Sequence, residues 1–93
     1  MAAKEMNKSM EKRLGVVAII LENRDYAEQV NDILHTYNQL IVGRMGIPYK
    51  ERGVAVISLI VDATGDEVSA LTGKLGRIEG VTVKSALAKG NAP

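Results

Sequence analysis

Cysteine, phenylalanine and tryptophan are all missing from this sequence, and only three tyrosines and one histidine are present. Without cysteine the chain can form neither disulfides nor thiol-based active sites, which fits a reducing compartment. Because tyrosine is so rare, the stacking surfaces that bind single-stranded nucleic acid are nearly absent. The core must therefore be aliphatic, built from valine, isoleucine, leucine and alanine.

A strong charge of one sign is also lacking, since the formal net charge is +1. This balance does not favour nucleic acid or a membrane surface as a partner. The longest apolar run, Val16–Leu21, is far shorter than a membrane span, and Met1–Leu14 lacks the apolar run of a signal peptide. We therefore expect a cytoplasmic protein with no membrane contact and no direct nucleic acid binding by the isolated chain.

Four stretches have the composition of β-strands. Leu14–Leu21 and Val54–Val61 are short, rich in β-branched residues and apolar on both faces, which predicts two central strands. Gln39–Ile47 is interrupted by two glycines that suggest a bulge, and the turn Pro48–Gly53 leads from it into the next strand. Val81–Leu87 alternates apolar and polar residues and fits an edge strand.

Two stretches have the apolar spacing of helices. The first helix is expected to start at Asp25, as its cap, and to end at Asn38 in the left-handed conformation. The second follows the capping box Thr64–Glu67. It contains Gly73 and Gly76, whose cost to the helix suggests close packing on the sheet.

The resulting order is β-α-β-β-α-β, and right-handed crossovers place both helices on the same face of the sheet. The predicted fold is therefore α+β, a ferredoxin-like sandwich with a four-stranded antiparallel sheet and two helices on one face. We expect this domain to span residues 14–88. Residues 1–13 are expected to be a mobile N-terminal arm, and residues 89–93 a loose tail.

The face of the sheet that the helices leave open is predicted to be apolar. It would carry one alternating set of the first strand, either Gly15, Val17, Ile19 and Leu21 or the residues between them, beside residues of Val54–Val61. Such a patch is an aggregation risk in a monomer. We expect a second copy to cover it, giving a symmetric homo-oligomer, a dimer or a tetramer. The alternative is that the N-terminal arm folds back over this face.

Signals for catalysis or metal binding are poor. The serines lie in no nucleophile motif. The single histidine, His35, is interpreted as a solvated or partly packed helix residue, and the alternative is a ligand role across a subunit interface. No catalytic residue, metal or cofactor is predicted. Arg44 lies between Gly43 and Gly46, where its cation is suited to a carboxylate or a phosphate, although a bulged strand explains the same residues. The stretch does not have the spacing of a P-loop.

Three segments together, Gly43–Tyr49, Gly53–Asp62 and Leu71–Arg77, resemble a bacterial family of small ACT-like proteins, the iron-only hydrogenase system regulators. The likeness extends from about Leu14 to Ala88. It implies an ACT-like ferredoxin fold, an oligomer, and a regulatory role linked to hydrogenase expression or assembly, with no catalytic residues to carry over. Where this family would have glycine after Tyr37, the chain has asparagine.

ACT relatives often bind small ligands, commonly amino acids, where the first strand meets the first helix at a subunit boundary. By position this resemblance implies a ligand site at Asn23, Arg24 and Asp25, to which we add Arg44 and Gly46 as candidates. Nickel-responsive repressors share the ACT-like fold, but their metal sites use several histidines and a cysteine. The lone histidine here does not support a nickel site.

The expected function is therefore non-enzymatic. We expect an oligomeric regulatory module of an iron-only hydrogenase system that senses a small ligand or a protein partner. The alternative is a structural scaffold or assembly protein that binds no ligand.

Overall fold

The computed structural model describes residues 11–90, in which four strands and two helices follow the predicted order. The strands are β1 (Arg13–Leu21), β2 (Ile41–Tyr49), β3 (Val54–Ala63) and β4 (Val81–Leu87). The helices are α2 (Ala27–Thr36) and α3 (Gly65–Gly76). Three short 3₁₀ turns join them: η1 (Arg24–Tyr26), η2 (Asn38–Leu40) and η3 (Lys50–Arg52). Most of the predicted arm and part of the predicted tail lie outside the described residues.

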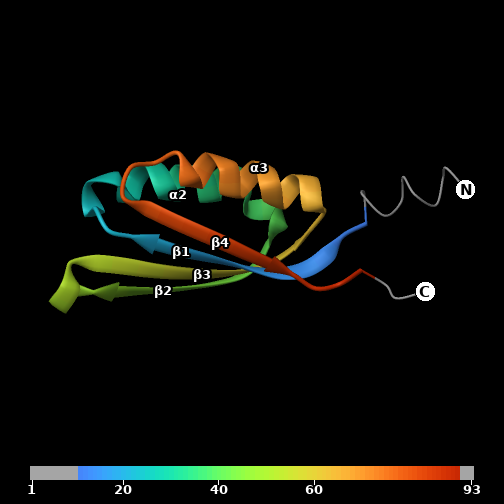
Figure 1. The fold of residues 1–93 in the computed structure, drawn as a ribbon, viewed down its shortest axis with the longest axis horizontal. Helices are drawn as coiled ribbons and strands as arrows, with labels where there is room; N and C mark the ends of the chain where they lie inside the picture. The colour runs from blue at the N-terminus through green and yellow to red at the C-terminus, as the bar shows by residue number, and fades with distance from the viewer. Residues whose placement is uncertain (1–10, 91–93) are drawn as a thin grey trace, which may run out of the picture.

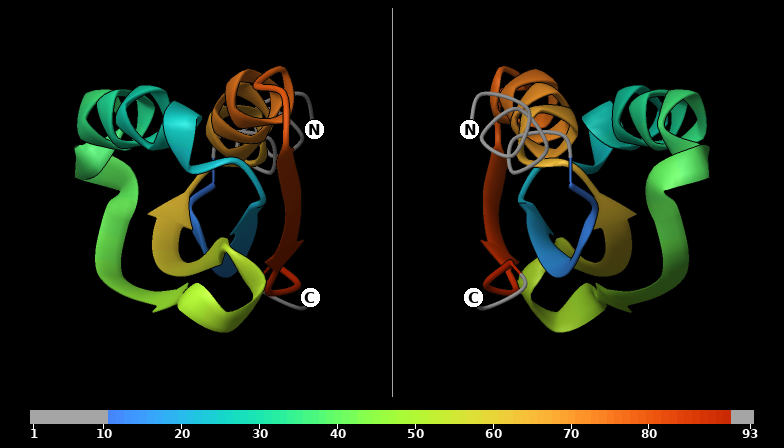
Figure 2. Two further views of the ribbon diagram at one scale, coloured as in Figure 1. Left: turned by 90° about the vertical axis from the view of Figure 1, so that its left-hand side faces the viewer. Right: turned by 90° about the vertical axis from the view of Figure 1, so that its right-hand side faces the viewer.

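The four strands form one antiparallel sheet in the order β2-β3-β1-β4. The two strands predicted to be central are central, and β4 is an edge strand as expected. Figure 1 shows α2 and α3 above the sheet. The end-on views of Figure 2 show the two helices side by side, with nothing described on the other side of the sheet. This arrangement is the predicted ferredoxin-like sandwich.

The core lies between the helices and one face of the sheet. Alternate residues of β1 and β3 point into it, among them Val17, Ile19 and Leu59, which are fully buried. Each helix contributes one stripe of apolar side chains to the core. An aliphatic side chain stabilises the fold by about 1.5–3 kcal/mol when it is fully buried. The buried helical residues are Val30, Leu34, Val68, Leu71 and Leu75.

The start of the first helix differs from the prediction. Asp25 is not its cap: the side chain of Asn23 accepts the backbone N–H of Asp25 at 2.9 Å and caps the 3₁₀ turn η1 instead. Helix α2 starts at Ala27, and its N-cap residue Tyr26 makes no side-chain capping bond. Asparagine and aspartate cap about equally well. Here the turn that Asn23 caps occupies Arg24–Tyr26, so the α-helix starts only after it.

The end of this helix was also wrongly predicted. Asn38 is not left-handed, because no described residue other than glycine has a positive φ. The helix gives way to η2, and β2 consequently starts at Ile41 rather than Gln39. The predicted bulge is confirmed, since the register of β2 with β3 shifts between Ile41 and Gly43. Gly53, at φ 67°, turns the chain into β3 as expected.

The glycines of the second helix do not both pack on the sheet. A Cβ built at Gly73 would meet nothing within 4 Å, and one at Gly76 would lie 3.5 Å from Val83, an ordinary contact. The close approach is in β1 instead. A Cβ at Gly15 would lie 2.5 Å from the Leu87 side chain and 2.8 Å from the backbone oxygen of Ala86.

Alanine should therefore have opposite effects at two of these glycines. We expect Gly15→Ala to lower the free energy of unfolding by about 1–3 kcal/mol, because β4 must move away from β1. Gly73→Ala should raise it by about 1 kcal/mol, because alanine favours the helix and meets no neighbour. Urea denaturation of both variants measures the two changes. Equal effects at the two positions would contradict the packing described here.

The capping box predicted at the start of α3 is confirmed. The hydroxyl of Thr64 accepts the N–H of Glu67 at 3.1 Å, and the Glu67 carboxylate accepts the N–H of Thr64 at 2.9 Å. The bond from the Thr64 backbone lowers the pKa of Glu67 below its ordinary value of 4.5.

This lowered pKa predicts a dependence of stability on pH. A carboxylate whose pKa is lower in the folded chain stabilises the fold above its ordinary pKa of 4.5. The contribution is lost as the pH falls through the lowered value. The difference in unfolding free energy between wild type and Glu67→Gln should therefore shrink between neutral pH and about pH 3. Asp66→Asn, which removes a charge from the same turn but keeps the capping bond, is the control. A Glu67→Gln difference independent of pH would contradict the role of the charge.

Candidate functional site

The first three candidate ligand residues lie together in the connection from β1 to α2. Asn23, Arg24 and Asp25 are all exposed there. The backbone N–H of Glu22 donates to the carbonyl of Gly80 at 2.7 Å and ties this connection to the start of β4. The three residues thus sit at one end of the sheet, on a loop held by its neighbours.

The other two candidates, Arg44 and Gly46, lie on the edge strand β2. They pair with Leu59 and Ile57 of β3, so both are on the helix side of the sheet. The guanidinium of Arg44 donates to the side-chain oxygen of Asn31 on α2 at 2.8 Å. This bond joins the edge strand to the helix layer at the surface of the protein.

One chain does not bring the two groups of candidates together. Arg44 is level with Val17 of β1, four residues before the end of that strand, and two strand spacings away from it. Together these steps separate Arg44 from the β1–α2 connection by on the order of 15 Å. The predicted ligand residues therefore form two separate surfaces within a single chain.

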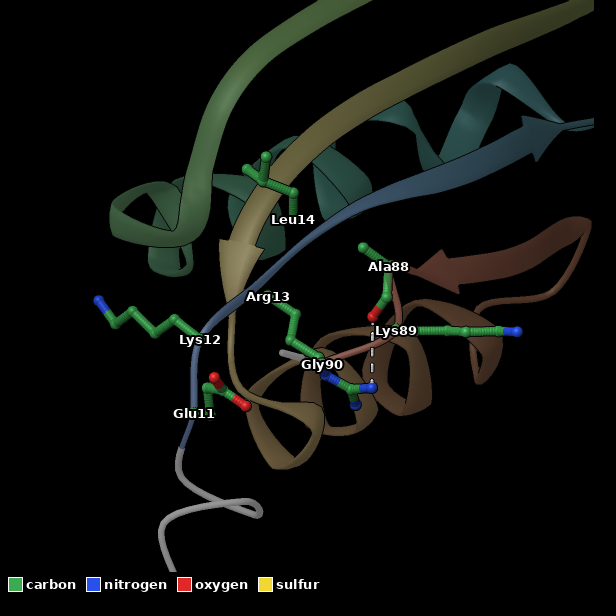
Figure 3. A pocket seen from close by; sticks show the side chains of 7 residues that line it. All are labelled: Glu11, Lys12, Arg13, Leu14, Ala88, Lys89 and Gly90. Carbon is green, nitrogen blue, oxygen red and sulfur yellow. Dashed lines mark hydrogen bonds between the residues drawn. The ribbon is translucent and has the colours of Figure 1, made fainter. Parts of the chain in front are cut away.

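A third feature, which was not predicted from the sequence, lies where β1 begins and β4 ends. A pocket of about 260 Å³ is lined by Glu11, Lys12, Arg13, Leu14, Ala88, Lys89 and Gly90. Arg13 donates to the carbonyl of Ala88 at 3.4 Å, whereas Lys12 and Lys89 point away from it (Figure 3). Because the three cations do not converge, the pocket does not form an anion site. It lies where the two ends of the domain meet. No local motif marks it, because its residues meet only through strand pairing.

The largest unusual surface is the open face of the sheet. The structure describes nine large apolar side chains as exposed, and eight of them point to this face. They belong to the set of β1 that alternates with the buried one, and to β2 and β3. They are Leu14, Val16, Ile20, Met45, Ile47, Tyr49, Val56 and Ile60, each between 40% and 65% exposed.

The centre and the rim of this face differ in chemistry. Ala18 and Ser58 pair at the centre, so small side chains are surrounded by larger apolar ones. Two charged residues lie on the face itself: Asp62, opposite Leu14, and Lys84, opposite Ala18. We define the open sheet face as the eight apolar residues together with Ala18, Ser58, Asp62 and Lys84.

Residues 11–90 form neither a metal site nor a membrane-spanning helix. His35 is exposed on α2, as expected. No three histidine, aspartate or glutamate side chains of this segment gather as they would around a metal ion. Neither helix of this part of the chain has the length and apolarity needed to cross a membrane.

Comparison with known proteins identifies relatives of this fold. Residues 13–85 match the family model TM1266-like, which describes an iron-only hydrogenase system regulator. The structure of TM1266 from Thermotoga maritima is 41% identical in sequence and superimposes with a TM-score of 0.81. The match covers 85% of this chain and 100% of that one. No curated protein matches the sequence.

More distant structures share the fold alone. The ACT domain of the GTP pyrophosphokinase of Chlorobium tepidum is 19% identical, with a TM-score of 0.70 over 81% of this chain and 99% of that one. CutA1 from Oryza sativa is 17% identical, with a TM-score of 0.50 over 90% of this chain and 86% of that one. The ACT-like fold expected from the sequence is therefore confirmed.

Proposed function

The chain belongs to the TM1266-like family of iron-only hydrogenase system regulators, and we propose that it is a non-enzymatic regulatory module that works as a homo-oligomer. In this proposal the module senses a small ligand or a protein partner and acts on hydrogenase expression. The observation that carries the oligomer is the open sheet face. The regulatory role rests on the family.

The area of the open sheet face supports a second copy as its cover. A fully exposed large side chain presents on the order of 200 Å² to water. With the exposed fractions given above, the eight apolar residues together leave on the order of 700 Å² in contact with water. A monomer rarely exposes an apolar patch of more than a few hundred Å². A stable interface buries about 800 Å² on each partner. The face thus has the size of one half of a dimer interface.

The candidate ligand residues support the sensing part of the proposal through their chemistry. Arg24 is exposed in the β1–α2 connection, and Arg44 is exposed on the edge strand. A guanidinium binds a carboxylate through two parallel hydrogen bonds, as an amino acid would require. Because the two surfaces lie far apart in one chain, a site that uses both needs two neighbouring copies. The exposed residues Asn23, Asp25 and Gly46 are further candidates for the same ligand site.

The second candidate function is a scaffold that assembles hydrogenase-related components without a ligand. It uses the same oligomer and leaves Arg24 and Arg44 as ordinary surface residues. The two functions differ in whether a small molecule stabilises the folded chain.

The oligomer can be tested with one substitution made on two surfaces. Ser58→Asp puts a carboxylate at the centre of the open sheet face, between Ala18 and Met45, whereas Ser69→Asp makes the same change on the exposed side of α3. We expect wild type and Ser69→Asp to be oligomers and Ser58→Asp to be a monomer, because an unpaired charge is costly to bury between apolar faces. Native mass spectrometry gives the three masses, and circular dichroism checks that both variants fold.

The same pair of variants tests the role in cells. Regulation of expression predicts that Ser58→Asp changes the level of hydrogenase transcripts and that Ser69→Asp does not. A change in hydrogenase activity at unchanged transcript levels would favour the scaffold. A monomeric wild type would contradict the proposed oligomer.

Ligand sensing predicts a rise in melting temperature with a bound small molecule. The probes are the free amino acids, added one at a time. A ligand at a hundred times its dissociation constant stabilises the folded state by about 2.7 kcal/mol. We expect Arg24→Ala and Arg44→Ala to reduce the rise and Arg77→Ala, an exposed arginine after α3, to leave it intact. A rise that survives both substitutions would contradict the site. No rise with any amino acid would favour a protein partner or the scaffold.

A further inference from the structure

The two charges of the open sheet face have no partner within the described chain. Neither Asp62 nor Lys84 forms an ion pair or a side-chain hydrogen bond with any residue of the segment 11–90. Lys84 is opposite Ala18, and Asp62 is opposite Leu14, four residues earlier in β1 and two strands away from β4. From strand spacing and rise, the two backbone positions are on the order of 15 Å apart. They are therefore too distant to pair with each other in one chain.

If a second copy covers this face, both charges leave water. A buried charge is tolerated when an opposite charge meets it and is costly otherwise. In a symmetric dimer whose two-fold axis lies parallel to the two sheets and passes through the Ala18–Ser58 pair at the centre of the face, the direction of that axis fixes what meets each charge. The positions of Asp62 and Lys84 therefore discriminate between the ways in which two copies can stack.

Two directions of the axis leave the charges without partners. An axis across the strands lays β4 over the β4 of the second copy at the same level, so Lys84 meets Lys84. An axis along the strands lays β4 over the β2 of the second copy, so Lys84 meets Met45 and Asp62 meets Leu14. The first arrangement opposes two like charges, and the second buries each charge against an apolar side chain.

An oblique axis, at about 45° to the strands, gives a different result. The strands of the two stacked sheets then cross nearly at right angles, which is one of the two common ways in which sheets pack. For one of the two oblique directions, Asp62 of the first copy lies about 7 Å, in projection, from Lys84 of the second. Lysine is long enough to span that gap. The symmetry then forms the same pair a second time.

We infer that two copies pack face to face with crossed strands, so that Asp62 of each copy pairs with Lys84 of the other. The inference rests on the proposed oligomer and adds its geometry. The apolar residues of the open sheet face supply the buried area, and the two ion pairs fix the orientation. Charge pairs at an interface act in this way, because wrong orientations bring like or unpaired charges together.

Charge reversal tests this geometry through rescue. The variants are Lys84→Asp, Asp62→Lys and the double variant that carries both changes. Each single variant should raise the dissociation constant of the dimer at least tenfold, because it opposes like charges at two places. The double variant should return it to within about threefold of wild type, because each pair is restored with its signs exchanged. Arg77→Asp, a charge reversal beyond α3, should leave dimerisation unchanged.

Sedimentation velocity over a concentration series measures these constants, and melting temperatures show that each variant is folded. If wild type dimerises and Ser58→Asp dissociates it, but the double variant fails to rescue the single ones, the crossed geometry is wrong while the proposed oligomer stands. If neither single variant weakens the dimer, the geometry is also wrong. A monomeric wild type would overturn both, and would leave the N-terminal arm as the alternative cover of the face.

Discussion

The rest of the structure depends on one constraint: the two central strands are apolar on both faces. The helices satisfy this constraint on one side, where Val17, Ile19 and Leu59 are fully buried. On the other side Val16, Ile20 and Ile60 remain 40–42% exposed in the described chain. The same strands that hold the monomer together therefore present its largest apolar surface. In a domain of this size, such a surface favours association over a solitary monomer.

The sequence was sufficient for the fold because the relevant signals are local. Each signal involves residues that are close in the chain: the apolar residues that recur at every second position of a strand, the apolar stripes of the helices, and the capping box at Thr64. The errors arose where two local solutions compete. Asn23 and Asp25 are capping residues of similar strength, so residue type alone does not decide between them, and the structure uses Asn23. The role of Gly15 could not be predicted, because its neighbours in β4 are about seventy residues away.

The functional surface was predicted less completely. The sequence indicated an apolar open face but left two alternating sets of β1 open, and the structure selects the set that contains Val16 and Ile20. The polar Ser58 held part of the answer, since a serine in an otherwise apolar strand favours the less buried face. The ligand candidates could not be tested in this way. Arg44 and Asn23 were grouped by chemistry and by resemblance, and chain connectivity alone does not show that they are far apart.

The position of the candidate ligand loop matters for how a regulator of this kind could work. Strand β1 takes part in the core, in the open sheet face and in the support of the candidate ligand loop. The connection that carries Arg24 starts directly after Leu21, the last residue of this strand. The hydrogen bond from Glu22 to Gly80 also joins this loop to the start of β4, the strand that carries Lys84. A ligand that orders the loop would act on both strands that border one half of the proposed interface. Binding and association would then be coupled through shared strands, and linkage requires such coupling to be equal in both directions.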